Sequence, residues 1–291
     1  MSLKEEGYSV TATSRAFGIN RSTYYKRSGK ENNRQPSSIL DEDLTKKIRR
    51  ILDNEETFGY RRVWATIKFK EGIDVNVKKV HRIMKFKGWQ CRLWNRPSYV
   101  PKATYVKKST VASPDTLWST DLTKIYCGQD GWASLIAVID NGSREITGYR
   151  FSLRGRAIEA TDALEQGLIG TYGQLKAPEG LRLRSDNGSI FLAKDFIKTS
   201  KKLGIKQEFI PKREPEYNGC IERFFRTLKQ ECVWLNTFNS FDEAEPIVIK
   251  WINCYNNERL HSALGYKTPA QWKKQFYFPI AVYALWVHNL C

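Results

Sequence analysis

Three acidic residues stand in local sequences that could supply carboxylate ligands to a metal ion. Asp121 lies in WSTD, Asp186 lies in SDNG, and Glu222 lies in GCIERFFRTLK. Carboxylate oxygens are the ligands that Mg²⁺ and Mn²⁺ prefer, and two such ions about 3.5–4 Å apart can catalyse phosphodiester cleavage. Taken one at a time, the three acids are more simply an exposed strand residue, a turn residue and a helix-surface residue. Their meaning therefore depends on the elements that carry them.

The elements that would carry these acids follow one another after residue 116. Three strands come first, and the turn CGQDG predicts a hairpin between the first two. Helices then alternate with short strands, which is the order of a mixed α/β sheet. The helix over 191–204 is expected to bury Leu192, Phe196 and Leu203 and to end at Gly204. The predicted strands are 117–127, 132–140, 145–153, 180–188 and 205–211, and the predicted helices are 157–172, 191–204 and 218–232.

The last of these helices has two faces. Its apolar residues recur at i, i+3, i+4, i+7 and i+11, a spacing that predicts one buried stripe. Glu222, Arg226 and Lys229 form a second stripe about a quarter-turn or more away, so the helix would present a carboxylate and two cations to a site. Asn218 is the expected N-cap. The apolar stripe consists of Ile221, Phe224, Phe225, Leu228 and Cys232.

The charge of the chain is unevenly distributed. Its 48 Lys and Arg residues against 31 Asp and Glu residues give 48 − 31 = +17. Residues 1–110 hold 25 basic and 11 acidic residues, or +14, and residues 111–291 hold 23 and 20, or +3. This surplus predicts a polyanionic partner for the front of the chain. The hydrophobic content of 41% excludes disorder throughout. The six cysteines form no CxxC pair and the three histidines are scattered, which argues against a zinc site and favours reduced thiols.

The basic front has a helical pattern typical of a DNA-binding domain. A helix is expected after Asp41, with Leu44, Ile48, Ile51 and Leu52 on one face. A second helix over 58–72 and a turn at 71–74 lead to a third helix over 75–88. A basic helix after a tight turn has the geometry of a major-groove reader, although a solvated basic face without specificity has the same pattern. The residues expected to face DNA are Asn76, Lys78, Lys79, Arg82 and Lys85.

Two further segments belong to this basic front. Residues 8–27 carry a weaker pattern, which fits either a small helix-turn-helix or a plain surface pair of helices. Residues 92–116 contain three prolines and no helical period, so they are expected to form an extended basic linker. Lys102, Lys107 and Lys108 in this linker would suit phosphate contacts.

The segments WSTD, SDNG and PEYNGCIERFFRTLKQE together resemble the DDE motif of the retroviral-integrase-like transposases of bacterial insertion sequences. Asp186 and Glu222 are separated by 35 residues (222 − 186 − 1), and Lys229 follows Glu222 by seven, as in that family. The block YNNERLHSALGYKTPAQW at 255–272 resembles the family's C-terminal signature. The helices of the basic front resemble the domain that precedes the core in the OrfB-type product. The resemblance covers roughly residues 8–272.

The resemblance implies a ribonuclease H-like mixed-sheet core preceded by a small all-helical helix-turn-helix domain. Asp121, Asp186 and Glu222 would be the catalytic residues and would bind two Mg²⁺ or Mn²⁺ ions, with Asp121 shared between them. Lys229, and with it Arg226, would contact a DNA phosphate. The chain would bind double-stranded element ends and target DNA as a homo-multimer, with an OrfA-type partner or fusion.

Several alternatives stay open. Arg259 and His261 are either satisfied structural side chains or contacts to DNA or to the catalytic helix. Asp140 also ends a strand and is a weaker candidate ligand, whereas Glu216 falls in a proline-containing loop and is rejected. Tyr255 with Arg259 and His261 does not make a tyrosine recombinase, because the other arginines of such a site are not in order. Two other functions compete with DNA transposition: non-catalytic DNA binding by a transposase-derived protein, and ribonuclease H-like cleavage without strand transfer.

The expected organisation has five parts, and the last of them is unusual. Residues 275–291 carry no charge, but their apolar run is too short to cross a bilayer, so no membrane anchor is expected. Because the resembling family ends soon after its Thr-Pro block, we expect an aberrant tail from a truncated or frameshifted end. The acidic N-terminus is no signal peptide, so a bacterial cytoplasmic, nucleoid-associated protein is expected. The parts are a helical segment 1–35, a helical DNA-binding domain 38–91, a linker 92–114, the catalytic core 115–272 and an apolar tail 273–291.

Overall fold

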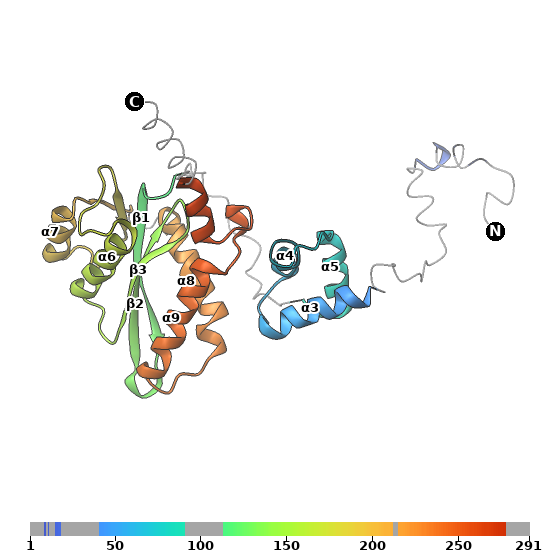
Figure 1. The fold of residues 1–291 in the computed structure, drawn as a ribbon, viewed down its shortest axis with the longest axis horizontal. Helices are drawn as coiled ribbons and strands as arrows, with labels where there is room; N and C mark the ends of the chain where they lie inside the picture. Colours follow the sequence, from blue (N-terminus) through green and yellow to red (C-terminus); the bar gives the residue numbers. More distant parts are fainter. Residues whose placement is uncertain are drawn as a thin grey trace, which may run out of the picture. The chain divides into compact units, whose positions relative to one another are not determined.

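The computed structural model describes Ser9, Thr11 and residues 15–18, 41–90, 113–211 and 215–277, and Figure 1 shows its helices and strands. They belong to two compact units, Met1–Trp64 with Asp74–Gln90 and Ala65–Ile73 with Cys91–Cys291. Most of the helical pair predicted over 8–27, and the linker lysines Lys102, Lys107 and Lys108, lie outside the described residues.

Between residues 41 and 90, the first unit contains three short helices. Helix α3 (Glu42–Asn54) begins where the sequence predicts it, because Asp41 accepts a hydrogen bond from the Leu44 amide at 3.0 Å and caps the helix. The predicted second helix is shorter than expected: α4 (Tyr60–Ala65) gives way to a π-helical turn, η2 (Thr66–Lys70), which belongs to the second unit. Helix α5 (Val77–Phe86) confirms the third. The buried side chains of α3, α4 and α5 in this unit include Leu44, Ile48, Ile51, Leu52, Val63, Val80, Ile83 and Met84.

A five-stranded mixed sheet forms the centre of the second unit. Its strands are β1 (Leu117–Tyr126), β2 (Trp132–Asp140), β3 (Ile146–Ser152), β4 (Arg182–Ser185) and β5 (Lys206–Phe209), in the order β3-β2-β1-β4-β5. The first three are antiparallel neighbours, which confirms the hairpin predicted between the first two. Strands β4 and β5 join the other side of β1 in parallel. Among the described residues, four short 3₁₀ segments lie at η3 (Gly128–Asp130), η4 (Pro215–Asn218), η5 (Val233–Leu235) and η6 (Ser262–Leu264).

Helices cover both faces of the sheet, as Figure 1 shows for this unit. On one face, Ile136 and Val138 of β2 pack with α6 (Ala157–Tyr172) and α7 (Lys194–Lys202). On the other face, Leu135, Ala137 and Ile139 pack with α8 (Gly219–Glu231) and α9 (Phe241–Asn257). Because both faces of β2 are covered, its side chains are buried from Ala133 onward, which explains its continuous apolar sequence.

The buried faces predicted for α7 and α8 are confirmed with one exception. All five residues of the α8 stripe are buried, and so are Phe196 and Leu203 around α7. Leu192 is 46% exposed, so the prediction that it packs was wrong. Helix α7 starts only at Lys194, after Ala193 in extended conformation, and Leu192 therefore precedes the helix and does not share its apolar face.

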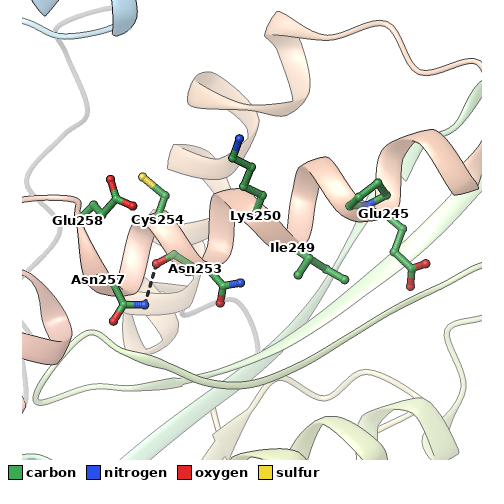
Figure 2. Close-up of a pocket in the computed structure, with 8 residues that line it drawn as sticks. Glu245, Ile249, Lys250, Asn253, Cys254, Asn257 and Glu258 are labelled. Carbon is green, nitrogen blue, oxygen red and sulfur yellow. Dashed lines mark hydrogen bonds between the residues drawn. The ribbon is translucent and has the colours of Figure 1, made fainter.

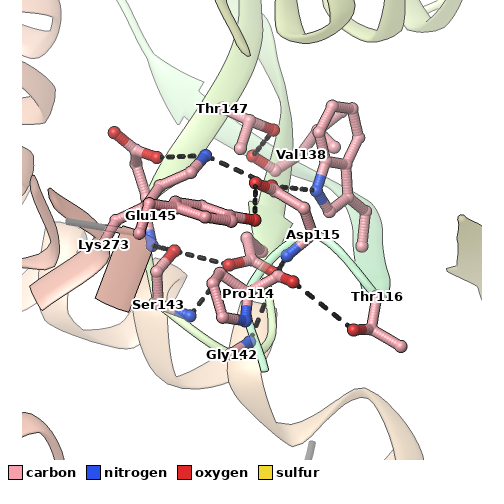
Figure 3. A network of polar contacts seen from close by, with 12 residues as sticks. Pro114, Asp115, Thr116, Val138, Gly142, Ser143, Glu145, Thr147 and Lys273 are labelled. Atoms are coloured by element: carbon pink, nitrogen blue, oxygen red, sulfur yellow. Dashed lines mark hydrogen bonds and ion pairs between the residues drawn. The ribbon is translucent and has the colours of Figure 1, made fainter. Parts of the chain in front are cut away.

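The C-terminal helix of the described chain is tied to the start of β1 by a polar network (Figure 3). Residues 269–277 are helical, and Lys273 pairs with Glu145 at 2.9 Å and with Asp115 at 3.2 Å. The Tyr277 hydroxyl donates to Asp115 at 3.0 Å. Residues 273–277 therefore extend the core beyond 272, where the sequence predicts an apolar tail to begin. In the part of the chain that the structure describes, no helix is long and apolar enough to cross a membrane.

The same network shows what Asp140 does. Its carboxylate accepts hydrogen bonds from the amide and the hydroxyl of Ser143, at 2.8 and 2.5 Å, and from the amides of Gly142 and Asp115 at 3.3 and 3.1 Å. Four donors leave this buried carboxylate satisfied within the turn after β2. Asp140 is therefore a structural residue, and the preference for the other acids stands.

Candidate active site

Two of the three predicted acids lie at neighbouring positions on parallel strands. Strand β1 pairs with β4 in the register Ser119↔Arg184. Asp121 and Asp186 each lie two residues beyond this pair, Asp121 within β1 and Asp186 directly after β4 ends. The parallel pairing thus brings together two carboxylates that are 186 − 121 = 65 residues apart in sequence. This is the convergence that the sequence patterns could not establish by themselves.

The turn after β4 holds the Asp186 carboxylate in place. The Gly188 amide donates to Asp186 Oδ1 at 2.9 Å, and the Asn187 side chain donates to the Ile210 carbonyl at 2.8 Å, beyond the end of β5. A Cβ at Gly188 would lie 2.8 Å from the same Oδ1, so glycine leaves the carboxylate room. Asn187 and Gly188 therefore stabilise the turn beside Asp186.

The segment before α8 is bonded to both acid-bearing strands. Arg184 of β4 donates to the Tyr217 carbonyl at 3.1 Å, and the Asn218 side chain donates to the Thr120 carbonyl of β1 at 3.4 Å. Both Tyr217 and Asn218 belong to the 3₁₀ turn η4 (Pro215–Asn218), which leads directly into α8. Asn218 is the N-cap residue of α8, as predicted, but its side chain makes no capping hydrogen bond and holds the turn against β1.

Electrostatics place Glu222 and Lys229 near Asp121. Burial raises the pKa of Asp121 to about 6, against a lowering by the Leu122 amide, which donates to it at 2.7 Å. The carboxylates of Asp186 and Glu222 raise this pKa further, and the Lys229 ammonium lowers it. Acids from β1, the end of β4 and α8 therefore share one electrostatic environment with one cation of the predicted stripe.

The three carboxylates are close but are not gathered around one point. Within the described ranges, no group of three or more His, Cys, Asp or Glu side chains is arranged to hold a metal ion. The donor set nevertheless has the chemistry that Mg²⁺ or Mn²⁺ requires, since all three side chains offer hard oxygen ligands. Burial is the main reason for the raised pKa of Asp121, and the charges of Asp186 and Glu222 add to it.

The pKa of Asp121 predicts how the stability of the metal-free protein depends on pH. A carboxyl whose pKa rises from 3.8 to about 6 on folding binds its proton more tightly in the folded state, so ionisation destabilises the fold as pH rises through this window. Asp121→Asn removes this effect. With EDTA present, the free energy of unfolding of the variant, relative to that of wild type, should therefore rise by roughly 1 kcal/mol between pH 5 and pH 7.5. The full effect of a pKa shift of this size is about 3 kcal/mol. Urea unfolding at the two pH values measures it, and a difference independent of pH would contradict the prediction.

A hollow on α9 lies apart from these acids. It has a volume of about 640 Å³ and follows the outer face of the helix, as Figure 2 shows. Asn257 donates to the carbonyl of Asn253 one turn earlier, at 3.0 Å, beside Cys254 and Lys250. None of the predicted acids lines this hollow, so it is not the place of the proposed metal chemistry.

The predicted DNA-facing residues of α5 differ in their surroundings. Lys78, Arg82 and Lys85 are exposed. Lys79 is partly buried and pairs with Asp41 at 2.5 Å, so its charge is already engaged within the unit. Asn76 is exposed, but its side-chain oxygen caps α5 by accepting from the Lys78 amide at 2.9 Å. The basic face available to a ligand is therefore narrower than the sequence predicts.

Arg259 and His261 turn inward and are not placed as a DNA-contacting pair. The Arg259 guanidinium pairs with Glu231, and the side chains are only 12% and 8% exposed. The His261 ring lies edge-on to Tyr255, with ring centroids 4.7 Å apart. The geometry thus favours the structural interpretation of these two residues.

The sequence interpretation missed Arg184 and Glu208, which brace the strand that precedes Asp186. Glu208 of β5 pairs with Arg182 at 3.0 Å and with Arg184 at 3.3 Å across the parallel ladder. The alternation of Arg182 and Arg184 on one face of a short strand was a usable signal, but their acidic partner could not be identified without the pairing of β4 and β5.

Comparison with known families agrees with this architecture. Residues 111–215 and 203–269 each match an integrase core domain, and residues 40–97 match an HTH-like domain. The first two matches overlap and together follow the chain from the start of the sheet to the loop after α9. The HTH-like match covers α3, α4 and α5. The fold is therefore an integrase-type, ribonuclease H-like core preceded by a helix-turn-helix-like region.

Known proteins resemble the chain over most of its length. It is 24% identical over 279 residues to transposase InsD for insertion element IS2A/D/F/H/I/K of Escherichia coli, with 92% of each chain covered. It is equally similar to InsD for IS2-9 of strain K12, with 90% of that protein covered. Among solved structures, the BIV integrase catalytic core (22% identity, 55% of this chain and 95% of that one) and the HTLV-2 integrase catalytic core in complex with magnesium (20%, 55% and 97%) are similar at TM-scores of 0.40. Together, the matches to the integrase core and HTH-like domains and the likeness to InsD over most of the chain indicate an insertion-element transposase of the integrase type.

Proposed function

We propose that this chain is a DDE transposase that cleaves DNA at the ends of its insertion element and joins the freed 3′-hydroxyl to target DNA. The observation that carries the proposal is the shared environment of Asp121, Asp186 and Glu222, which come from β1, the end of β4 and α8. Lys229 lies on the same side of α8 as Glu222 and acts on the same carboxylate. A surface with three acids and one cation suits a reaction in which metal ions and DNA phosphates meet.

Asp121, Asp186 and Glu222 would hold two Mg²⁺ or Mn²⁺ ions. When bound, such ions activate the attacking hydroxyl and stabilise the leaving oxygen. The three carboxylates would have to close in from their present positions, and cation charge would offset the repulsion that raises the pKa of Asp121. Lys229, with Arg226 one turn before it, would hold a phosphate oxygen of the DNA near the scissile bond.

The same side chains of the site would serve both proposed steps. In the first, a water oxygen attacks the phosphorus at the element end, the bond from phosphorus to the 3′-oxygen breaks, and the 3′-hydroxyl leaves. In the second, that 3′-hydroxyl loses its proton and attacks a target phosphodiester, and one phosphorus–oxygen bond forms as another breaks. The number of phosphodiesters is conserved in the second step, so it needs no external energy source and no covalent protein intermediate.

DNA and further copies of the chain are the proposed partners. The exposed Lys78, Arg82 and Lys85 of α5 would contact double-stranded element ends. Joining two ends to one target requires at least two active sites, so we propose a homo-multimer. The sequence shows no sustained heptad repeat, and an OrfA-type partner or fusion would supply a coiled coil and a second end-binding motif.

One assay tests the function against both alternatives. A labelled duplex carrying an element end is incubated with Mg²⁺ or Mn²⁺ and wild type, Asp186→Asn or Asp195→Asn, the last being an exposed acid of α7. Joined products that require metal, vanish with Asp186→Asn and persist with Asp195→Asn support transposition. Cleavage without joining would indicate a nuclease, and binding without either reaction would indicate a non-catalytic DNA-binding protein.

A further inference from the structure

A buried ion pair joins the end of α8 to the loop that follows α9. Arg259 Nε lies 2.9 Å from Glu231 Oε2, and Nη2 lies 3.0 Å from Oε1, so the guanidinium grips both carboxylate oxygens. The side chains are 12% and 8% exposed. A two-point contact between planar groups fixes orientation as well as distance, which a lysine cannot do. Glu231 is the last residue of α8, so the pair holds the helix at its C-terminal end.

Neighbouring side chains reinforce this contact. Tyr255 meets Phe224 of α8 edge-on, with ring centroids 5.0 Å apart, and the Arg259 guanidinium lies 5.6 Å from the centre of the Tyr255 ring. Asn256 binds both main-chain groups of Ile146 at the start of β3, each at 2.9 Å. The segment is therefore anchored to the sheet on one side and grips α8 on the other.

The position of the pair on α8 connects it to the candidate active site. Glu231 follows Glu222 by nine residues and Lys229 by two, so at about 1.5 Å per residue it lies roughly 13 Å along the axis from Glu222. A helix of this length moves as a rigid rod, and a shift or rotation at its end is passed on to Glu222. The start of α8 is held separately by Arg184 and Asn218, so the two ends together determine how the helix faces β1.

The charges also explain why this end needs an arginine. A glutamate at the C-terminal end of a helix faces the negative end of the helix dipole. Its burial makes an unpaired charge costly. Arg259 offsets both effects, because its positive charge neutralises Glu231 at this end of the helix.

We infer that Arg259 is a positioning residue for the reaction proposed above: its ion pair with Glu231 sets the depth and rotation of α8 and thereby places Glu222 and Lys229. The inference rests on the proposed function for its link to catalysis, while the clamp on α8 itself does not. Among the alternatives left open for Arg259, it favours a contact with the catalytic helix over a contact with DNA.

The test compares wild type with Arg259→Lys, which keeps the charge and loses the two-point grip. Arg150→Lys is the matched control, because Arg150 forms an exposed pair with Asp162 at 3.8 Å, 55% and 46% exposed. Three quantities are measured on the full chain: end cleavage against Mn²⁺ concentration, duplex binding without metal, and hydrogen exchange of the α8 amides without metal. With Arg259→Lys we expect about tenfold slower cleavage, a several-fold higher Mn²⁺ concentration for half-maximal rate, and faster exchange in α8 but not in α6. Duplex binding should not change.

Other outcomes overturn the inference. Weaker duplex binding with an unchanged Mn²⁺ requirement would return Arg259 to the role of a DNA contact. Unchanged exchange in α8 would show that the pair does not hold the helix. If Arg259→Lys does not fold, the exchanged pair Arg259→Glu with Glu231→Arg replaces it, and restoration of α8 protection and cleavage relative to either single change is expected; absence of both would contradict the proposal. If Arg259→Lys speeds exchange in α8 while wild type itself shows no metal-dependent cleavage, the proposed function fails and the clamp stands.

Discussion

Glu222→Gln should abolish both cleavage and joining, with each rate falling by about three orders of magnitude or more. Glutamine keeps the size of the side chain but carries no charge, so it is a much poorer ligand for a hard divalent ion. Glu222 lies on the partly exposed face of α8 and not in its buried stripe, so the substitution should leave the packing of the helix intact. The expected protein is therefore folded, binds duplex DNA and does no chemistry. Rates on a labelled element-end duplex in saturating Mn²⁺ measure the effect.

The matched control for this substitution is Glu165→Gln. Glu165 is also a partly exposed glutamate within a helix, but α6 packs on β2 and β3 and carries none of the three acids. It should cleave and join at the wild-type rate. A Glu222→Gln protein that stays within tenfold of wild type would remove Glu222 from the proposed metal site, and equal losses in both variants would point to a general effect of helix charge.

Gly148→Ala should destabilise the core strongly, because a single added methyl group has no room between the sheet and α6. Gly148 pairs with Val138 in the ladder of β2 and β3, and α6 crosses directly over it. A Cβ at this position would lie 2.0 Å from the Ala163 carbonyl oxygen and 2.7 Å from the Gly167 amide nitrogen. Both are backbone atoms, so no side-chain rotation relieves the clash and α6 must move away from the sheet. We expect a loss of about 3 kcal/mol or more, seen as a melting temperature lower by roughly 6–12 °C.

The control is Gly170→Ala, which lies in α6. A Cβ there would meet only the Thr147 carbonyl oxygen, at 3.9 Å, which is an ordinary contact. Because alanine favours the helix over glycine, this variant should be as stable as wild type or more stable by up to about 1 kcal/mol. Thermal unfolding followed by circular dichroism compares the two. Equal melting temperatures would show that the sheet and α6 are not packed as closely as the structure has them.

The local patterns in the sequence predicted most elements of the core. The expected strand 132–140 and helix 157–172 coincide with β2 and α6. The apolar stripe of the helix after Asn218 is buried in α8 as expected. Such elements show their periodicity within about ten to sixteen residues, because one face must be apolar to pack. Where the pattern was mixed, as at Thr66–Lys70, the predicted helix became a π-helical turn.

Contacts between distant segments could not be predicted in this way. The sequence around Lys79 does not indicate that its ammonium pairs with Asp41, 38 residues away. Lys79 was therefore predicted to face DNA together with the other cations of α5. Asn218 lies at the N-cap of α8, but its side-chain nitrogen donates to the Thr120 carbonyl of β1 and its oxygen caps no helix amide. Arg259 could be assigned either to DNA or to the protein until its partner was known. In all three cases the outcome depends on which group lies opposite, and that is a property of the packing.

The sequence by itself determined the kinds of elements, the basic front, and which acids were candidates, because residue type and period act locally along the chain. Only the tertiary structure decided that β4 lies beside β1 in parallel, which puts Asp186 next to Asp121, and that α8 crosses close enough for Glu222 and Lys229 to act on the same carboxylate. Electrostatic coupling falls with distance in space and not with separation in sequence. The pKa of Asp121, the availability of each cation and the clamp on α8 therefore became visible only once the sheet order and the helix packing were known.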